Sequence, residues 1–385
     1  MDDLLRIDEQ LHDDERMIRD TVARFVSHDV LPLMAESFEH ATFPPELIKK
    51  SAELGLLGLT LPVQYGGAEA SYVAYGLVCQ ELERGDSGLR SFVSVQSSLC
   101  MYPIFRYGNE AQKVRFLPSM AAGNLIGCFG LTEPDSGSDP ASMHTVAKKV
   151  DGGWRLNGAK MWITNATIAD LAIVWAKTDA GIRAFIVEKE FKGFTRREIK
   201  LKMSLRASIT GELVFDNVFV PDDNLLPGSE RGLGAALSCL SQARYGIAWG
   251  AIGAAMACFD MTRDYLLGRK QFDRPLASFQ LIQKDLAEMY TEILKAQCLN
   301  LHIGRLKDAQ CETPVMISLA KGNACREALK IARTCRNLLG ANGVSLEYHV
   351  IRHMLNLESV FTYEGTDNVH TLVLGRHITG INAFG

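Results

Sequence analysis

The sequence predicts an α+β protein built from three consecutive parts: a helical part, a β-rich part and a second helical part. Apolar residues recur three and four positions apart before residue 125 and again after residue 231, which is the spacing of one helix face. Between them, short β-branched runs are separated by Gly, Asp and Asn, as strands are by turns. Because the chain of 385 residues contains no internal repeat and no low-complexity linker, we expect the parts to share interfaces.

The first part is predicted to span residues 1–125. In ERMIRDTVARFVSHDVLPLM the apolar residues keep the helical spacing, and few runs resemble strands. PPELIKKSAELGLLGL begins with prolines, which the first turn of a helix tolerates, and the loop PVQYGG follows. We therefore expect a helical N-terminal domain.

The second part, residues 126–230, is predicted to be a compact β domain. LAIVWA, RAFIVE and ELVFDNVFV are short β-rich runs, and VDGGW at 150–154 is typical of a hairpin turn between HTVAKKV and WRLNG. Helix is predicted again over 231–385. Within this part, apolar residues recur at spacings of three and four, and we expect this stripe to pack against other helices. It consists of Phe279, Ile282, Leu286, Met289 and Ile293.

The overall composition argues against several classes of function. The formal net charge is −4 and no block is rich in Lys and Arg, so we expect no nucleic-acid partner. No apolar run approaches the ~20 residues of a membrane span. The N-terminal stretch MDDLLRIDEQLHDDERM is neither a secretory signal nor an Arg-rich transit peptide, so we expect a cytoplasmic protein or the mature form of a mitochondrial-matrix protein. Nine cysteines without a CxxC pair predict reduced thiols.

Several catalytic motifs are missing. His349 and His353 are four residues apart in HVIRH, but the acid of a zinc-protease helix and a third ligand are lacking, so we expect no metal site. The sequence has no GxxxxGK(S/T) loop, no strand-borne GxGxxG and no GxSxG. This disfavours a P-loop enzyme, a two-half Rossmann fold and a serine hydrolase.

Two stretches of the β-rich part are unusual. GCFGLTEPDSGSDP (127–140) places Thr132, Ser136 and Ser138 among glycines, so it offers N–H groups and hydroxyls to a polar planar ligand or to phosphate. In KMWITNA (160–166) the indole of Trp162 can lie on a ring system while the hydroxyl of Thr164 bonds a ring heteroatom. Each stretch alone fits ordinary loop and core equally well, but together they indicate a large aromatic cofactor.

Near the end of the chain, FTYEGTDNVHTLVLGRHITG (361–380) places one acid, Glu364, between an aromatic residue and a glycine. Such neighbours suit a catalytic base, whose basicity is raised by desolvation. A glutamate stabilised by the dipole at a helix N-terminus fits the same stretch, and the residues alone favour this second interpretation. Both interpretations stay open at this point.

Six motifs occur in order along the chain: LTEPDSGSD, WITN, ARYGIAWG, RKQF, LLGANGVS and YEGT. In them the sequence resembles the acyl-CoA dehydrogenase family over essentially its whole length. Within that family it looks most like the glutaryl-CoA dehydrogenases, through RSFVSVQSSL (90–99), SLRAS (204–208), EYHVIRHMLNLE (347–358) and LGRHITGINAF (374–384). The resemblance implies a helical N-terminal domain, a middle β-barrel domain, a C-terminal four-helix bundle, an FAD cofactor and a homotetramer.

The resemblance also implies which residues bind FAD. The flavin is expected at Phe129, Leu131, Thr132, Gly137, Ser138, Trp162, Ile163 and Thr164. Residues expected to reach the FAD of a neighbouring subunit are Arg269, Gln280, Asn337, Leu338, Leu339, Gly340 and Ala341. Three more residues follow YEG, namely Thr366, Asp367 and Asn368. The chain departs from the family at Asp273, where Gly is usual after RKQF, and at Asp367 and Asn368, where His-Asp is usual.

For the chemistry, the resemblance implies that Glu364 is the catalytic base of an acyl-CoA oxidation. It takes the weakly acidic α-hydrogen of the thioester, and the β-hydrogen leaves as hydride to FAD. By the resemblance, Arg90 and Ser91 occupy the family's glutarate-binding positions, and Glu83 matches a carboxylate near that site. An arginine suits such a position because a desolvated substrate carboxylate must be paired. The other residues expected along the substrate are Ser138, Cys239, Arg244, Tyr245, Gly246, Tyr363, Gly365 and Phe384.

Tyr363 precedes the base, as it does in family members that decarboxylate their substrate. The expected reaction therefore converts glutaryl-CoA to crotonyl-CoA and carbon dioxide, with an electron-transfer flavoprotein as electron acceptor. Four alternatives stay open. They are a dehydrogenase for another short acyl-CoA, a glutaryl-CoA dehydrogenase that does not decarboxylate, an acyl-CoA oxidase, and a flavin- or CoA-binding protein without activity.

Overall fold

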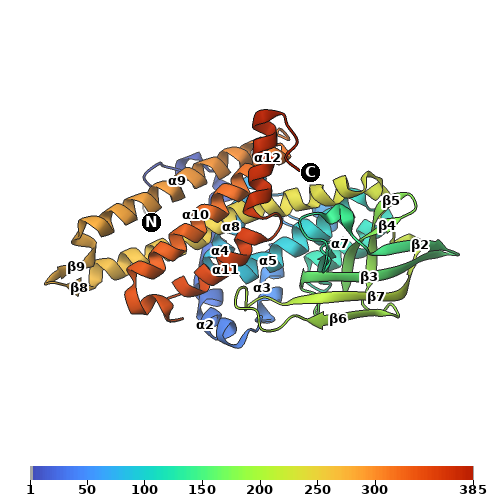
Figure 1. Cartoon of the computed structure of the whole chain (residues 1–385), viewed down its shortest axis with the longest axis horizontal. Helices are drawn as coiled ribbons and strands as arrows, with labels where there is room; N and C mark the ends of the chain where they lie inside the picture. Colours follow the sequence, from blue (N-terminus) through green and yellow to red (C-terminus); the bar gives the residue numbers. More distant parts are fainter. Residues whose placement is uncertain (1–2, 385) are drawn as a thin grey trace.

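The computed structural model describes residues 3–384, so residues 1, 2 and 385 of the outer predicted parts lie outside it. In Figure 1 helices fill one end of the molecule and strands gather at the other, with the long α8 (Leu233–Gly268) running between the two ends. The predicted order of helical, β-rich and helical parts is confirmed. The predicted boundaries at 125/126 and 230/231 stay predictions.

In the N-terminal part, helix α4 (Tyr72–Gly85) packs against α1, α5 and α8, and most of its residues are buried. Asp86 follows α4 and begins α5 (Ser87–Ser94) by accepting the N–H of Gly88 at 2.6 Å, as a helix N-cap does. The other elements of this part are η1 (Asp8–Gln10), α1 (Asp13–Phe25), η2 (Val26–Val30), α2 (Leu31–His40), α3 (Glu46–Glu53), η3 (Val63–Tyr65), η4 (Val95–Met101), α6 (Tyr102–Tyr107) and α7 (Glu110–Ala121).

The strands form one seven-stranded sheet in the order β1-β4-β2-β3-β7-β6, and β5 pairs with β4. The predicted hairpin is confirmed, because β2 (Val146–Val150) and β3 (Gly153–Thr164) pair antiparallel. Where β3 pairs with β7 (Thr210–Pro221), a β-bulge shifts the register between Lys160 and Ile163. The other elements are β1 (Gly127–Gly130), η5 (Pro140–Ser142), β4 (Leu171–Thr178), β5 (Gly181–Glu188), β6 (Phe194–Glu198), η6 (Asp222–Asn224) and η7 (Pro227–Arg231).

Helices α4 and α8 approach each other closely because glycines lie at their contact. A Cβ on Gly253 of α8 would lie 1.9 Å from the backbone oxygen of Gln80, and a Cβ on Gly76 of α4 would lie 2.4 Å from the indole of Trp249. Only glycine permits such an approach. The N-terminal helices and the C-terminal helices therefore share one hydrophobic core, as the lack of linkers predicts.

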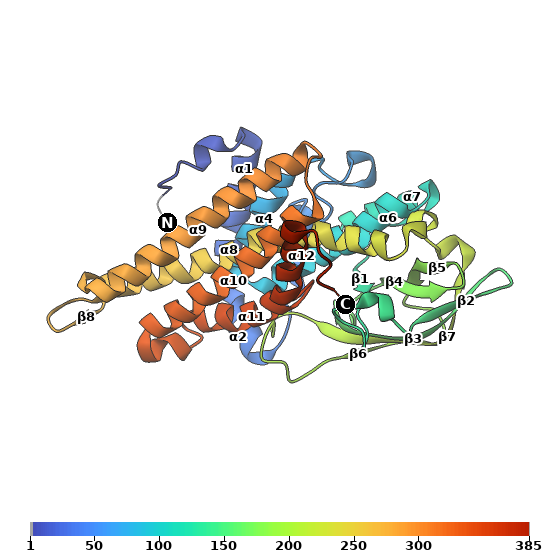
Figure 2. The ribbon, with the colours of Figure 1, turned by 45° about the horizontal axis from the view of Figure 1, so that its top comes forward.

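The C-terminal bundle consists of α8, α9 (Gln280–Asp308), α10 (Pro314–Leu338) and α11 (Val350–Thr362). In Figure 2, α12 (Asp367–Thr379) lies over α10, near the boundary between bundle and sheet. Within the predicted stripe, Met289 and Ile293 are buried, whereas Phe279 precedes α9 as its N-cap. The remaining elements are β8 (Lys270–Gln271), β9 (Arg274–Pro275), η8 (Leu276–Ser278) and η9 (Gly340–Val344).

None of the helices within residues 3–384 combines the length and the apolarity that crossing a membrane requires.

Candidate active site

Glu364 lies in the short turn between α11 and α12, where the backbone leaves the helical conformation. Tyr363 closes α11. Glu364 has φ +52° and Gly365 has φ +98°, and this left-handed region costs a non-glycine residue on the order of 1 kcal/mol or more. A Cβ on Gly365 would lie 2.8 Å from Nε2 of His370, so the next position requires glycine. The backbone is therefore strained at Glu364 itself.

Two cations hold this turn through its carbonyl groups. Nε of Arg244 on α8 donates to the backbone oxygen of Glu364 at 2.6 Å, and Nζ of Lys321 on α10 donates to the backbone oxygen of Gly365 at 2.8 Å. Two consecutive carbonyls are thus fixed from two different helices. These contacts offset the strain at Glu364 and fix the direction in which its side chain leaves the backbone.

The carboxyl group of Glu364 is poorly solvated. Its Oε2 is buried and has no hydrogen-bond partner in the described part of the chain. Burial raises the pKa of Glu364 to about 7, although the charges of Arg244, Arg90 and Lys321 act in the opposite direction. At neutral pH such a group is ionised in roughly half of the molecules, and it holds a proton well once it has taken one. These are the properties of a general base.

Beside this turn, four of the predicted substrate residues meet in one buried cluster. Arg90 on α5 is 1% exposed, and its Nε donates to Oε2 of Glu83 on α4 at 2.5 Å. Its Nη2 donates to the hydroxyl of Tyr363, which lies 3.5 Å from Oγ of Ser91. The Arg90 guanidinium is therefore in direct contact with the residue that precedes Glu364.

This buried cluster still has hydrogen-bonding capacity. Oε1 of Glu83 is buried without a partner among residues 3–384. A guanidinium carries five N–H donors, and the contacts with Glu83 and Tyr363 use donors on Nε and Nη2 of Arg90. Arg90 therefore keeps donors for the carboxylate of a ligand, which a guanidinium can grip through two N–H bonds.

A second buried pair ties α5 to α11, the helix that leads into the turn. Asp86, the N-cap of α5, accepts hydrogen bonds from Nη1 of Arg352 and, at 3.0 Å, from Nδ2 of Asn356. Asp86 and Arg352 are both 0% exposed. Oδ1 of Asn356 accepts the N–H of Leu205 at 2.8 Å, in the segment before β7. The Asp86 carboxylate thus links α5 to α11, and Asn356 extends this link to the β-rich part.

The two unusual stretches of the β-rich part are joined by their backbones and by a buried ion pair. The N–H of Met161 donates to the oxygen of Thr132 at 2.9 Å. Lys160 of β3 pairs with Glu133 at 2.8 Å, and Glu133 also accepts the N–H of Thr145 at 2.9 Å. Burial alone would raise the pKa of Glu133, but the hydrogen bonds outweigh it and lower the pKa to about 2. The glycine-rich loop is therefore fixed against the bulge of β3.

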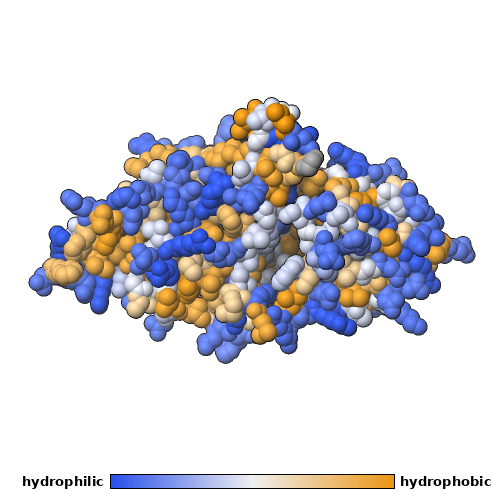
Figure 3. All heavy atoms as spheres, viewed as in Figure 1, coloured by the Kyte–Doolittle hydropathy of each residue, from blue (hydrophilic) through white to orange (hydrophobic). Residues whose placement is uncertain are grey.

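Trp162 stands on this bulge with φ +62° and with 57% of its surface exposed. An exposed indole beside backbone N–H groups and hydroxyls suits a flat ring system. Among the other residues predicted for the flavin, Phe129, Leu131 and Ile163 are buried, Thr132 and Thr164 are half-buried, and Gly137 and Ser138 are exposed. In Figure 3 the surface is hollowed near the middle of the view, where the bundle meets the β-rich part.

Besides the exposed Ser138, four of the predicted substrate residues lie neither in the cluster of Arg90 nor at the turn of Glu364. Cys239 is buried in a core cluster that also contains β-rich elements. The hydroxyl of Tyr245 donates to the Tyr72 oxygen at 2.8 Å. A Cβ on Gly246 would lie 2.9 Å from a thiol of α4, so this glycine serves helix packing. Phe384 is 40% exposed at the end of the described chain. Their contact with a substrate stays a prediction.

The residues predicted to serve a neighbouring subunit lie at the end of the bundle away from the strands in Figures 1 and 2. Arg269 and Gln280, both exposed, flank the β8–β9 hairpin. Asp273, which stands where the family usually has Gly, has φ +60° in this hairpin, a conformation that Asp tolerates better than most residues. At the end of α10, the exposed residues are Asn337, Gly340 and Ala341, Leu338 is half-buried, and Leu339 is buried.

Asp367 and Asn368 stand where the family usually has His-Asp, and the structure accounts for the first of them. Asp367 is the first residue of α12, where a carboxylate is favourable to the helix dipole, and it pairs with Arg326 on α10 at 2.7 Å. Thr366 caps the same helix by accepting the N–H of Val369 at 3.3 Å. Asn368 is exposed, and nothing in the structure explains it. Asp367 thus anchors α12 next to the turn of Glu364.

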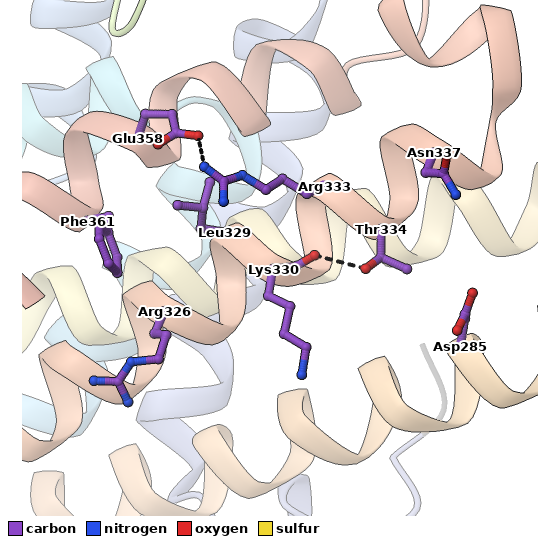
Figure 4. A pocket seen from close by; sticks show the side chains of 9 residues that line it. All are labelled: Asp285, Arg326, Leu329, Lys330, Arg333, Thr334, Asn337, Glu358 and Phe361. Carbon is purple, nitrogen blue, oxygen red and sulfur yellow. Dashed lines mark hydrogen bonds and ion pairs between the residues drawn. The ribbon is translucent and has the colours of Figure 1, made fainter.

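A groove of about 560 Å³ lies on the outer side of the bundle, between α9, α10 and α11 (Figure 4). Its walls are mostly charged, and Arg333 pairs with Glu358 across it. The residues that line it are Asp285, Arg326, Leu329, Lys330, Arg333, Thr334, Asn337, Glu358 and Phe361. Neither Glu364 nor Arg90 lines this groove, so it is separate from the cluster described above.

Sequence reasoning missed several residues that hold the site together. Lys321 lies between Ile317 and Cys325 on the buried face of α10, and a lysine at such a position is the signal that could have identified it. Asp86 carries no comparable signal, because its partner Arg352 lies 266 residues later in the chain.

Three consecutive family models match the chain: the acyl-CoA dehydrogenase N-terminal domain at residues 12–124, the middle domain at 128–218 and the C-terminal domain at 230–379. The chain belongs to the acyl-CoA dehydrogenase family. It is 53% identical to glutaryl-CoA dehydrogenase from Mycobacterium smegmatis, whose crystal structure aligns over 100% of this chain and 99% of that chain with a TM-score of 0.98.

The complex of the Mycobacterium smegmatis enzyme with FADH2 is 53% identical as well, over 99% of this chain and 98% of that chain, with a TM-score of 0.98. An acyl-CoA dehydrogenase of Bacillus subtilis strain 168 is 37% identical over 369 residues, which are 94% of this chain and 97% of the relative. These findings confirm the resemblance carried by the six motifs, its narrower likeness to glutaryl-CoA dehydrogenases, and the fold. The chain is an acyl-CoA dehydrogenase.

Proposed function

We propose that this acyl-CoA dehydrogenase oxidises and decarboxylates glutaryl-CoA, giving crotonyl-CoA and carbon dioxide. The observation that carries the proposal is the buried ion pair of Arg90 with Glu83, together with the hydrogen bond of Arg90 to Tyr363, the residue before Glu364. A five-carbon dicarboxylic acyl chain brings a second carboxylate to this cluster, where donors of Arg90 can pair it. A chain that ends in a methyl group would leave buried donors unmatched, which costs free energy.

The cofactor is FAD, and the residues present fit it. Trp162 offers an exposed face to a flat ring system, and the hydroxyl of Thr164 is two residues away. The loop of Thr132 is hydrogen-bonded to the same bulge, so the loop and the Trp162 segment lie beside each other at the proposed flavin site. When bound, FAD supplies at its N5 atom the acceptor for the hydride that leaves the β-carbon of the substrate.

Glu364 removes the proton from the α-carbon. Its pKa of about 7 leaves much of the carboxylate ionised at neutral pH, and its burial limits competition from water. Negative charge grows on the thioester oxygen as the proton leaves, and the backbone N–H of Glu364 is the proposed donor to it. Because Arg244 and Lys321 already hold the carbonyls of this turn, the donor needs little reorganisation.

Decarboxylation follows from the electronic structure of the oxidised product, an unsaturated thioester with a carboxylate on its γ-carbon. The bond between the γ-carbon and the carboxylate breaks, its electron pair moves into the conjugated thioester, and carbon dioxide leaves. The proton held by Glu364 then goes to the γ-carbon, which gives crotonyl-CoA. Arg90 and Tyr363, which contact each other, orient the carboxylate for this step.

The proposed assembly is a homotetramer, and the proposed electron acceptor is an electron-transferring flavoprotein. The β8–β9 hairpin, which Arg269 and Gln280 flank, lies at the opposite end of the molecule from β3, which carries Trp162 (Figures 1 and 2). If they bind FAD, they bind the FAD of another chain. Asn337, which the resemblance assigns to the FAD of a neighbouring subunit, lines the groove in Figure 4, and we propose that this surface faces another subunit.

The test compares two substrates on one variant. Arg90→Met alone would leave Glu83 as an unpaired buried charge, so the double variant Glu83→Gln/Arg90→Met removes both charges together. The yellow holoenzyme is mixed anaerobically with glutaryl-CoA or butyryl-CoA while the flavin absorbance is followed. Losing the charged contact costs ~2–5 kcal/mol, so the second-order rate constant of flavin reduction by glutaryl-CoA is expected to fall on the order of 100-fold. The value for butyryl-CoA is expected to change little.

Equal losses on the two substrates would show that Arg90 does not bind the second carboxylate. Products are identified by mass spectrometry after an electron acceptor is added to the wild-type enzyme. Crotonyl-CoA with carbon dioxide is the expected pair. Accumulation of glutaconyl-CoA would retain the roles of Arg90 and Glu364 but refute the decarboxylation step.

A further inference from the structure

Lys321 is a buried lysine that the steps above use only through its hydrogen bond to the Gly365 carbonyl. It lies on α10 at 0% exposure, on a helix face whose neighbours are small and apolar. In the described part of the chain it forms no ion pair with a carboxylate. Its Nζ instead donates to the Gly365 oxygen at 2.8 Å and to the Phe361 oxygen at 3.5 Å. An ammonium in such surroundings costs free energy, so a position filled by lysine rather than by leucine or methionine calls for a function.

The two acceptors of Lys321 lie on either side of the base. Phe361 is in the last turn of α11, where unpaired carbonyls and the helix dipole favour a cation. Gly365 is the residue after Glu364, and its oxygen is the stronger acceptor by distance. Lys321 therefore bridges the end of α11 and the strained turn, and its ammonium is hydrogen-bonded to the residue next to Glu364.

Charged and titratable groups face Glu364 from every helix packed around the turn. Arg244 comes from α8, Arg90 from α5, Lys321 from α10 and His370 from α12. Arg90 is already paired with Glu83, and the other two cations donate to carbonyls of the turn. Burial, with the charges of Lys321 and Arg244, lowers the pKa of His370 to about 3, so this ring carries no charge near neutral pH. Tyr363, next to Glu364, is a neutral phenol because burial raises its pKa.

We propose that Lys321 is a positioning residue for the base: it fixes the turn through the Gly365 carbonyl, and its charge favours the ionised form of Glu364. This inference rests on the proposed role of Glu364. Burial lowers the pKa of Lys321 from its ordinary value, while Cys325 and Glu364 act against that change, so Lys321 and Glu364 stabilise each other's charged forms. Without Lys321, the base would need a higher pH to ionise and its turn would be less fixed.

Proton abstraction can be measured without hydride transfer. Acetyl-CoA has α-hydrogens but no β-carbon, so the holoenzyme in D2O can exchange its α-hydrogens but cannot oxidise it. The exchange rate is recorded against pH by mass spectrometry for the wild type, Lys321→Met and Lys321→Gln. Gln removes the charge but keeps an N–H donor for the carbonyls. Lys295→Met is the matched control, because Lys295 is an exposed lysine of α9 that pairs with Glu292 on the surface.

In the wild type, exchange is expected to rise with pH as Glu364 ionises. In Lys321→Met and Lys321→Gln this rise is expected to move upward by on the order of one pH unit, as the loss of a nearby opposite charge predicts. Lys321→Met is also expected to exchange more slowly than Lys321→Gln on the high-pH plateau, because it holds neither carbonyl. Lys295→Met is expected to follow the wild type.

Coincident pH profiles for the wild type and both Lys321 variants would overturn the inference. So would a loss of bound flavin and of cooperative unfolding in both Lys321 variants but not in Lys295→Met, since Lys321 would then serve the fold alone. A different result concerns the proposed function. If Glu364→Gln exchanged α-hydrogens as fast as the wild type, Glu364 would not be the base, whatever the Lys321 variants did.

Discussion

Gly250 of α8 offers a way to disturb the carboxylate-binding cluster without touching any of its side chains. A Cβ at this position would lie 2.1 Å from Oε2 of Glu83 and 3.0 Å from Nε of Arg90. The Glu83 side chain is 0% exposed, so it cannot move into solvent. In Gly250→Ala the methyl group must therefore push the Glu83 carboxylate away from Arg90.

The magnitude follows from three opposing effects. Alanine is a better helix former than glycine by ~1 kcal/mol, which favours the variant. Overpacking costs ~1–3 kcal/mol, and a weakened charge-assisted hydrogen bond costs ~1.5–3 kcal/mol. We therefore expect Gly250→Ala to lower the free energy of unfolding by ~2–4 kcal/mol, against the sign of helix propensity.

The assay is urea unfolding of the holoenzyme, with Gly234→Ala as control. Gly234 lies in the same helix, and a Cβ there would meet no atom within 4 Å. The control is expected to match or slightly exceed the stability of the wild type. Gly250→Ala is also expected to lose more activity with glutaryl-CoA than with butyryl-CoA, since the displaced carboxylate misplaces Arg90. If both glycine variants were equally stable and kept the wild-type preference between substrates, the packing argument would be refuted.

Two further predictions follow from the buried groups. Asp86→Asn leaves Arg352 as an uncompensated buried charge, so it is expected to lower the free energy of unfolding by ~3–5 kcal/mol in a urea titration. The control Asp14→Asn, on the exposed face of α1, is expected to stay within ~0.5 kcal/mol of the wild type. The folded-state pKa of Glu364, about 7, lies above its ordinary value of 4.5, so the stability it contributes is present below 4.5 and is lost as pH rises through 7. This difference of about 2.5 in pKa corresponds to ~3 kcal/mol, so the free energy of unfolding of Glu364→Gln relative to the wild type is expected to rise by ~3 kcal/mol between pH 4.5 and pH 7. A difference that does not change with pH would contradict the raised pKa.

Local pattern alone determined the order of the parts and several of their elements. The hairpin at VDGGW was predictable because the strands on either side are close in sequence and the turn chemistry is local. Much of α9 was predictable because Met289 and Ile293 keep helical spacing with one side against the core. The six motifs sufficed to indicate the family, and the neighbours of Glu364 in the chain sufficed to mark it as an unusual acid.

The tertiary structure decided what Glu364 experiences. Its Oε2 is buried, and the cations around it come from α5, α8 and α10, whose residues lie far apart in the chain. The spacing of residues along the sequence carries no information about contacts between helices that lie far apart in the chain. The contact of Arg90 with Tyr363 spans 273 positions. It exists because glycines let α4 and α8 approach, and because Asp86 ties α5 to α11. Residue types could thus indicate a base, but its raised pKa depends on desolvation, which only the packed core provides.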